Sequence, residues 1–93
     1  MNMIVFALLG VNQSKLTSVL KRIKNLGAEN LNKVHLVYGE YDIIAELKAN
    51  DPEISTNLLQ SIKGIEGVNT LKTYVVSDQI TEGNIDSVLI ASN

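Results

Sequence analysis

Apolar residues recur with two different spacings along the chain, and this pattern predicts alternating strands and helices. Residues 3–9 are apolar at odd and even positions alike, which is typical of a strand that is buried on both faces and central in its sheet. Apolar residues then recur every three or four positions, which predicts an amphipathic helix with Asn12 or Ser14 as N-cap and Gly27 as its stop. The predicted buried stripe of this helix is Leu16, Val19, Leu20, Ile23 and Leu26.

The second half of the chain repeats this order. β-type runs over residues 34–38 and 42–48 predict two more strands, and residues 68–76 predict a fourth. Between them a helix is predicted to start after a capping Asp51, with proline in the first helical position and an acidic residue in the first turn. We expect Gly64 and the glycine three positions later to end it. Its predicted buried stripe is Ile54, Leu58, Leu59, Ile62 and Ile65.

The predicted element order is βαββαβ with a C-terminal extension over residues 77–93. Two βαβ units with right-handed crossovers fold into a four-stranded antiparallel sheet with both helices on one face, which is the ferredoxin-like α+β sandwich. The extension contains a polar turn over residues 77–84, and its apolar stretch at 88–91 predicts a fifth, edge strand. A chain of 93 residues makes one domain, so we assign residues 1–93 to a single unit.

One face of the predicted sheet has no helix to cover it. Because the first strand is apolar on both sides, the uncovered face also carries apolar side chains. The sheet of a second copy is the simplest cover, so we expect at least a homodimer with an assembly of the dimeric α/β-barrel type.

Composition excludes several classes of protein. The net charge is −2 and the basic residues do not cluster, so the footprint of a nucleic-acid-binding protein is missing. The absence of cysteine excludes disulfides and thiolate metal ligands and suits the cytosol. The apolar run at residues 3–11 is shorter than the roughly 20 residues of a membrane span and lacks the layout of a leader. We expect a cytoplasmic protein without a membrane segment.

The turn between the second and third strands concentrates unusual side chains. Gly39 tolerates a positive φ, as such a turn needs. Tyr38 and Tyr41, two of the four aromatic residues of the chain, flank it together with Glu40 and Asp42. Two interpretations stay open: the rings cap the end of the core, or the hairpin forms a contact with a small ligand or another subunit.

No motif predicts catalysis. His35 is the single histidine, so neither a histidine metal site nor a triad is suggested, and the glycines form neither a dinucleotide fingerprint nor a P-loop. Glu40 and Asp42 are an acid/base candidate, but carboxylates beside a hairpin more often cap a turn or bind a ligand amine. We therefore predict no catalytic residue, no metal and no cofactor.

Two runs, Gly39–Ile44 and Gly67–Val76, carry a resemblance to a known family. Together they resemble the effector-binding domain of the Lrp/AsnC (feast/famine) transcription regulators, also called the RAM domain, and the resemblance covers the whole chain. Full-length members have an N-terminal helix-turn-helix, whereas this chain begins at the first strand. The resemblance therefore implies a stand-alone RAM domain without a DNA-reading part.

The resemblance also implies an assembly and a site. Family dimers pack their open sheet faces together and form rings, commonly octamers, with small effectors, typically amino acids, in clefts between dimers. The implied ligand-binding residues are Gly39, Tyr41, Asp42, Asn50 and Asp51, with Thr70, Leu71 and Thr73 from the facing subunit.

The implied residues suit an amino acid chemically. A zwitterion needs an anion for its ammonium group, which Asp42 provides, and N–H donors for its carboxylate. Backbone amides at Gly39 and at the N-terminus of the helix that starts with Pro52 supply such donors. The alternative is that Asp42 only accepts hydrogen bonds from the hairpin backbone.

Three hypotheses for function follow. The first is an oligomeric amino-acid-sensing module in transcription regulation, with co-assembly with a full-length Lrp/AsnC-type regulator as one option. The alternative is a small dimeric α/β-barrel enzyme of the monooxygenase or isomerase type, since the same topology hosts these. Such enzymes usually need His, Asn or Trp inside the barrel, and this chain has no Trp. The third is an oligomerisation subunit without a ligand.

Overall fold

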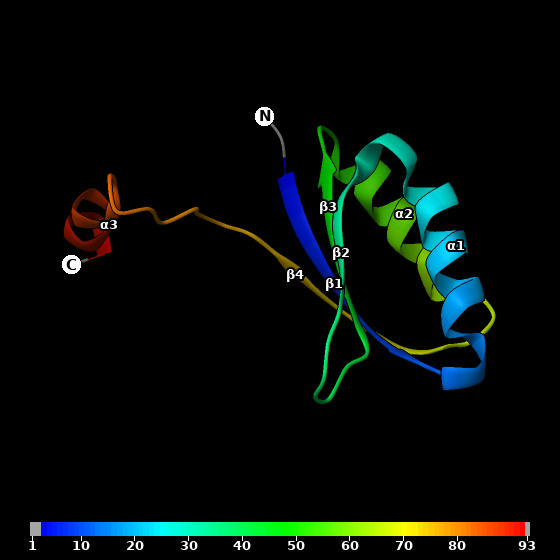
Figure 1. Cartoon of the computed structure of the whole chain (residues 1–93). Coiled ribbons are helices and arrows are strands. Elements are labelled where there is room, and N and C mark those ends of the chain that lie inside the picture. Colours follow the sequence, from blue (N-terminus) through cyan, green and yellow to red (C-terminus); the bar gives the residue numbers. More distant parts are fainter. Residues whose placement is uncertain (1–2, 93) are drawn as a thin grey trace.

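The computed structural model describes residues 3–92, which form a four-stranded antiparallel sheet with two helices on one face and a third helix at the C-terminus (Figure 1). The strand order is β2-β3-β1-β4, which is the predicted ferredoxin-like arrangement. In chain order the elements are β1 (Met3–Val11), η1 (Gln13–Lys15), α1 (Leu16–Gly27), η2 (Ala28–Asn30), β2 (Leu31–Leu36), β3 (Ile43–Ala49), α2 (Pro52–Lys63), β4 (Val68–Val75) and α3 (Ile85–Ser92).

β1 is central, as its apolar sequence predicted. It pairs antiparallel with β3 from Met3 opposite Ala49 to Leu9 opposite Ile43, and with β4 on its other side. Odd-numbered residues from Val5 onward are buried under the helices, whereas the even-numbered ones are only half-buried on the opposite face. One chain therefore buries one face of the strand fully and leaves the other, which we call the open face, without a helix (Figure 1).

The core lies between the sheet and the two helices. Ile23 of α1 and Ile62 of α2 are fully buried in it. The predicted stripe of α2 is wrong at Ile54, which is 44% exposed, while Ser55 is buried and donates its hydroxyl to the Pro52 carbonyl (2.9 Å). The face toward the sheet recurs at intervals of three and four residues from Ser55, so Ile54 falls just off it.

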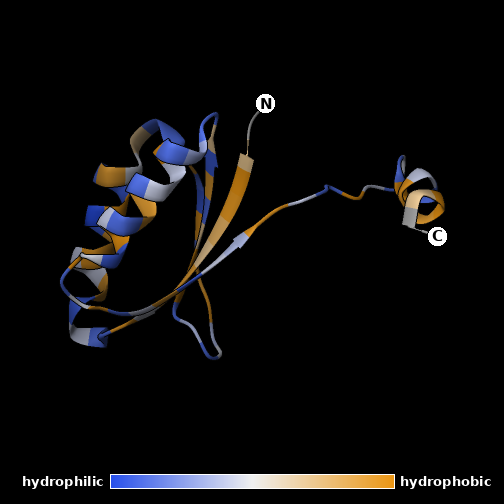
Figure 2. Cartoon of the chain, turned by 180° about the vertical axis from the view of Figure 1, so that it is seen from behind, coloured by the Kyte–Doolittle hydropathy of each residue, from blue (hydrophilic) through white to orange (hydrophobic). Residues whose placement is uncertain are grey.

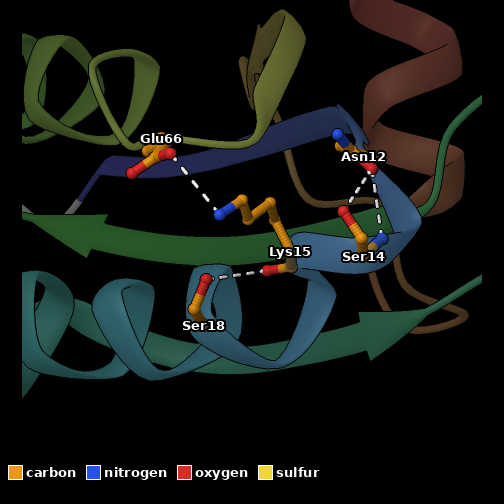
Figure 3. Close-up of polar contacts among 5 residues, drawn as sticks. All are labelled: Asn12, Ser14, Lys15, Ser18 and Glu66. Carbon is orange, nitrogen blue, oxygen red and sulfur yellow. Dashed lines mark hydrogen bonds and ion pairs between the residues drawn. The ribbon is translucent and has the colours of Figure 1, made fainter.

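Local hydrogen bonds shape the junction between β1 and α1 (Figure 3). The Asn12 side-chain oxygen accepts from the backbone N–H of Ser14 (3.1 Å) and from its hydroxyl (2.9 Å). Asn12 therefore caps the short turn η1 and not α1 as predicted, because the N-cap of α1 is Lys15, which makes no side-chain capping hydrogen bond. The next residue, Lys15, makes two contacts. Its carbonyl accepts from the Ser18 hydroxyl (3.0 Å), and its ammonium lies 3.5 Å from the Glu66 carboxylate.

The end of α1 differs from the prediction by one residue. Gly27 is the last residue of the helix with helical φ, and the following Ala28 takes the positive φ of 41° instead. Glycine avoids a tight contact here, because a Cβ on Gly27 would lie 3.0 Å from the Cβ of Leu31. β2 starts directly afterwards at Leu31, three residues earlier than predicted.

The predicted fifth strand at residues 88–91 is wrong, because this segment belongs to α3. The sheet ends where the Val76 N–H donates to the Ile4 carbonyl (2.9 Å), and the chain then leaves it (Figure 1). Within residues 3–92, no sheet edge therefore lies beside the apolar stretch. The Thr81 carbonyl instead accepts from the Ile85 N–H (2.9 Å), which starts a helix. This departure stretches the molecule to 48 Å along its longest axis.

Candidate functional site

The hairpin between β2 and β3 has an exposed tip. Gly39 adopts a φ of +147°, which confirms the predicted need for glycine in this turn. Tyr38 is fully exposed (108%), so it does not cap the core. Tyr41 is half-buried, and both rings are on the surface available to another molecule.

Asp42 fastens this hairpin to the end of β1. Its Oδ2 accepts the backbone N–H of Val11 at 2.7 Å, and its Oδ1 accepts the side-chain amide of Gln13 at 3.2 Å. Its own N–H donates to the Leu9 carbonyl (2.8 Å) and its carbonyl accepts from the Val37 N–H (3.0 Å). The carboxylate therefore has a structural role, although its two oxygens offer about four lone-pair positions and retain room for a further donor.

An open depression of ≈ 340 Å³ lies beside the Asp42 carboxylate. Its walls are mainly apolar, and the Asp42 carboxylate and the Gln13 amide are polar groups that border it. Such a lining suits a small molecule with one cationic group and an apolar side chain. The lining residues are Gln13, Leu16, Leu36, Val37, Tyr38 and Asp42.

Asn50 and Asp51 lie at the opposite end of β3. The Asp51 side chain accepts the N–H of Glu53 (2.9 Å), which confirms it as the N-cap of α2. Asn50 borders a separate depression of ≈ 490 Å³, together with Lys48 and the turn that precedes β2. Because β3 is extended over six residue steps, this end is about 20 Å from the hairpin.

The three predicted residues of β4 do not share a face. Thr70 pairs with Gly10 and lies on the open face, at the same end of the sheet as the hairpin and two strand spacings, about 10 Å, from β3. Leu71 and Thr73 face the helix side, where they line a groove of ≈ 200 Å³. Its other wall is α2, with Thr56, Leu59, Gln60 and Lys63.

One chain therefore does not gather the eight predicted residues into a single pocket. Gly39, Tyr41 and Asp42 lie at one end of the sheet, the Asn50–Asp51 turn lies at the other, and the groove on β4 lies along an edge. Each group borders an open surface. A ligand that contacts all of them needs residues from more than one subunit.

The structure adds residues that the sequence did not single out. Gln13 holds Asp42, and Lys63 brings a cation to the groove beside Leu71. On the open face the Lys72 ammonium lies 5.6 Å from the centre of the Tyr74 ring. The adjacent Tyr74 hydroxyl raises the pKa of Lys72 above 10.5, with Tyr41 acting in the same direction. Lys72 and Tyr74 share a face because they lie two residues apart on one strand, whereas only the sheet topology brings Tyr41 near them.

Two other features bear on function: a metal site and a membrane-spanning helix. Across residues 3–92 no group of three or more His, Cys, Asp or Glu side chains is placed to hold a metal ion. Within the same residues, no helix has the length and apolar character needed to cross a membrane.

A four-stranded sheet with two helices on one face defines the class as a ferredoxin-like α+β domain, and sequence comparison identifies the family. Residues 4–85 match the model of the Lrp/AsnC ligand binding domain. The chain therefore belongs to the Lrp/AsnC ligand-binding domain family, as its two sequence runs predicted. A search of curated proteins found no match.

Solved structures share the fold. TTHA0845 from Thermus thermophilus has a TM-score of 0.76 and 21% identity, covering 86% of this chain and 99% of that one. AsnC of Escherichia coli has a TM-score of 0.74 and 14% identity, covering 83% of this chain and 52% of AsnC. The feast or famine regulatory protein of Mycobacterium tuberculosis, solved with L-methionine, has a TM-score of 0.67 and 15% identity, covering 88% and 54%.

Family membership decides between the classes of function considered above. The Lrp/AsnC ligand-binding domain is a regulatory, non-enzymatic family, so the alternative of a dimeric α/β-barrel enzyme is set aside. The chain spans about half the length of AsnC and of the mycobacterial regulator. It also spans nearly all of TTHA0845, so chains of this extent occur among its structural relatives.

Proposed function

We propose that this domain binds an amino acid at a boundary between subunits and serves in transcription regulation. The observation that carries the proposal is the separation of the predicted site residues, which lie beside three open surfaces about 10–20 Å apart instead of in one pocket. A ligand held by all of them is shared between copies, so its binding reports on assembly.

The chemistry of two of these surfaces supports an amino acid. In the hairpin depression, Asp42 offers an anion beside the apolar Leu16 and Leu36. In the groove on β4, Lys63 offers a cation beside Leu71. If the first surface of one subunit faces the second of another, the ammonium and carboxylate of a zwitterion each meet an opposite charge. A family relative solved with L-methionine makes that amino acid the first probe.

The direct test is titration calorimetry of the full chain with L-methionine, followed by the other common amino acids. The amine that lacks the carboxylate and the acid that lacks the amino group are the matched controls. We expect a zwitterion to bind at least tenfold more tightly than either control, because each loses one charged partner. Equal affinity for all three, or no binding by any amino acid, would contradict the proposal and favour an oligomerisation subunit without a ligand.

A charge-removing variant tests the assigned role of Asp42. Asp42→Asn keeps the shape and one acceptor oxygen but loses the charge, and a charge-assisted hydrogen bond contributes about 1.5–3 kcal/mol. Affinity should fall roughly ten- to hundredfold. Glu40→Gln makes the same charge change at the exposed tip and should change affinity little. A variant that melts earlier yet binds as tightly as the original would leave Asp42 with its structural role alone.

We also propose that the domain forms homodimers that assemble into a higher oligomer such as an octamer, and that it co-assembles with a full-length Lrp/AsnC-type regulator. The support is the open face, where apolar side chains of β1 are only half-buried. Light scattering on a size-exclusion column tests the first part, and a stable folded monomer at micromolar concentration would contradict it. Co-purification with a tagged regulator from the same cell tests the second, and failure at every ligand concentration would refute it.

A further inference from the structure

The last residues of the chain form an arm that stands away from the domain. We define the C-terminal arm as residues 77–92; it carries α3 and projects from the end of β4 in both views (Figures 1 and 2). A helix of eight residues is marginal by itself in water, so α3 gains stability when it rests on another surface. The match to the family model ends at residue 85, so almost all of α3 lies outside the part of the chain that the family defines.

One side of α3 combines an acid with apolar side chains. Asp86, Leu89 and Ile90 are three and four positions apart, so they lie on the same side of the helix. All three are exposed, Leu89 to 57% and Ile90 to 75%, and Figure 2 shows the apolar colour of this helix. The arm has no Lys or Arg, and its charged residues are Asp78, Glu82 and Asp86. It therefore complements an apolar surface that carries a cation.

The groove between α2 and β4 has this character. Its apolar lining is Leu59 and Leu71, which pack on the core but are only half-buried. Lys63 lies four positions after Leu59, on the same side of α2, and is exposed. No carboxylate lines the groove. Among residues 3–92 the single ion pair joins Lys15 and Glu66, so the Lys63 ammonium has no anionic partner within the described chain.

The other open surfaces fit the arm less well. The hairpin depression is bordered by the Asp42 carboxylate, which repels an acidic arm. The depression beside Asn50 is lined mainly by polar side chains, and the acidic Glu29 is one of them. The open face is the surface that the family resemblance assigns to the packing of two sheets. The groove between α2 and β4 is therefore the surface that best matches the arm.

From these observations we propose that the C-terminal arm of one copy docks in the groove between α2 and β4 of a second copy. The Asp86 carboxylate meets the Lys63 ammonium, and the apolar side chains beside Asp86 cover the two leucines of the groove. The arm runs away from its own sheet after the Val76–Ile4 hydrogen bond, so the groove that it approaches belongs to another copy (Figure 1). This contact leaves the open face free, and because arm and groove are different surfaces it can join one sheet-packed dimer to another.

Docking of the arm goes beyond the proposed function and does not rest on it. The proposed function gives the same groove to the carboxylate of an amino acid, which would compete with Asp86 for Lys63. We therefore expect the arm and the ligand to exclude each other. Docking is measured first without a ligand, so that a failure of docking and a failure of ligand binding are distinguishable.

Cross-linking tests the docking directly, since the chain has no cysteine of its own. Leu89→Cys on the arm and Gln60→Cys in the groove, both at exposed positions, are made in separate chains. The two are unfolded in urea and refolded together, and a short bismaleimide is added. We expect a cross-linked pair that joins the two variants. Asn25→Cys, which replaces an exposed amide on α1, is the matched control and should give a much lower yield. Equal yields for Gln60 and Asn25 would overturn the proposal.

A chain with both Leu89→Cys and Gln60→Cys distinguishes a second copy from the chain itself. We expect its cross-linked products to be larger than one chain in denaturing gel electrophoresis. Products of single-chain size alone would show that the arm folds back into its own groove, which would refute docking between copies.

Competition with a ligand is measured with the same pair of single variants. L-methionine at a concentration that saturates the calorimetric titration should lower the cross-linked yield at least threefold. An unchanged yield with methionine bound would contradict the shared use of the groove. A chain that binds no methionine but cross-links as expected would count against the proposed function alone.

Charge reversal tests the pair of Asp86 and Lys63. Lys63→Glu in the Gln60→Cys chain, or Asp86→Lys in the Leu89→Cys chain, should lower the cross-linked yield at least threefold, because each brings like charges together. Combining the two changes should restore the yield to within twofold of the original. Lys24→Glu, at an exposed position of α1, is the control and should change the yield less than twofold. A combination that yields no more than the single reversals, or a loss with Lys24→Glu as large as that with Lys63→Glu, would contradict the proposal.

Discussion

Three glycines in this fold allow backbone strain and steric space to be separated in one experiment. Gly39 and Gly67 both have positive φ, of +147° and +103°, and each is followed by a strand. They differ in their surroundings: a Cβ on Gly39 meets nothing within 4 Å, whereas a Cβ on Gly67 would lie 2.5 Å from the Cβ of Lys15 and 3.1 Å from Val19. Gly64 has an ordinary φ of −81° and serves as the control.

The expected costs follow from these surroundings. An L side chain in a sparsely populated region costs on the order of 1–3 kcal/mol, so Gly39→Ala should lower the free energy of unfolding by about that amount. Gly67→Ala adds overpacking against Lys15 and Val19, typically about 1–3 kcal/mol more, for a total of roughly 2–6 kcal/mol. Gly64→Ala meets only contacts at 3.6 Å and should stabilise by about 0.4–1 kcal/mol.

Urea unfolding followed by circular dichroism measures these differences, since the chain has no Trp for fluorescence. Protein concentration is held fixed because assembly makes apparent stability depend on it. If Gly67→Ala costs no more than Gly39→Ala, the close approach to Lys15 does not restrict the site. If Gly64→Ala costs as much as Gly39→Ala, the positive φ of Gly39 does not account for the loss of stability.

Three further predictions concern single side chains and binding. Asp42→Ala leaves the N–H of Val11, a residue only 5% exposed, without its acceptor, so it should lower the free energy of unfolding in urea by about 1.5–3 kcal/mol. Gln13→Ala should lower it by under about 0.5 kcal/mol, and equal effects of the two variants would refute the anchoring role of Asp42. Asp51→Ala should lower stability by about 1 kcal/mol through loss of the α2 cap, and an unchanged melting temperature would contradict this. The chain by itself should show no sequence-specific DNA binding, and a nanomolar, sequence-dependent mobility shift at physiological salt would overturn that expectation.

Local sequence determined the elements of the main domain and their order. The continuous apolar run of β1, the three- and four-residue spacing of α1 and the Asp51–Pro52 start of α2 each encode their structure in neighbouring residues. The sequence also predicted the positive φ of Gly39, because a tight hairpin restricts backbone conformation locally. With the order βαββαβ, handedness rules leave few topologies, and the observed one is among them.

The C-terminal segment, residues 77–92, shows where local pattern was insufficient to predict the structure. An apolar stretch of four residues fits a strand or a buried helix equally well, and the outcome depends on whether a sheet edge lies beside it. After Val76 the chain turns away from the sheet, so no edge of the described sheet is within reach and the Thr81–Asn84 turn starts α3 instead. This decision comes from the path of the chain in space.

Side-chain partners in the candidate site also depend on the tertiary structure. Asp42 meets the Val11 N–H 31 residues away in the chain, and Lys72 lies near Tyr41 of the hairpin because β3 and β4 both flank β1. Likewise, the distance of the Asn50–Asp51 turn from Gly39 follows from the extended length of β3. Local sequence determines which residues can form strands, turns and caps, because these depend on near neighbours. Which side chains meet is decided by strand register and packing, which arise only when distant segments come together.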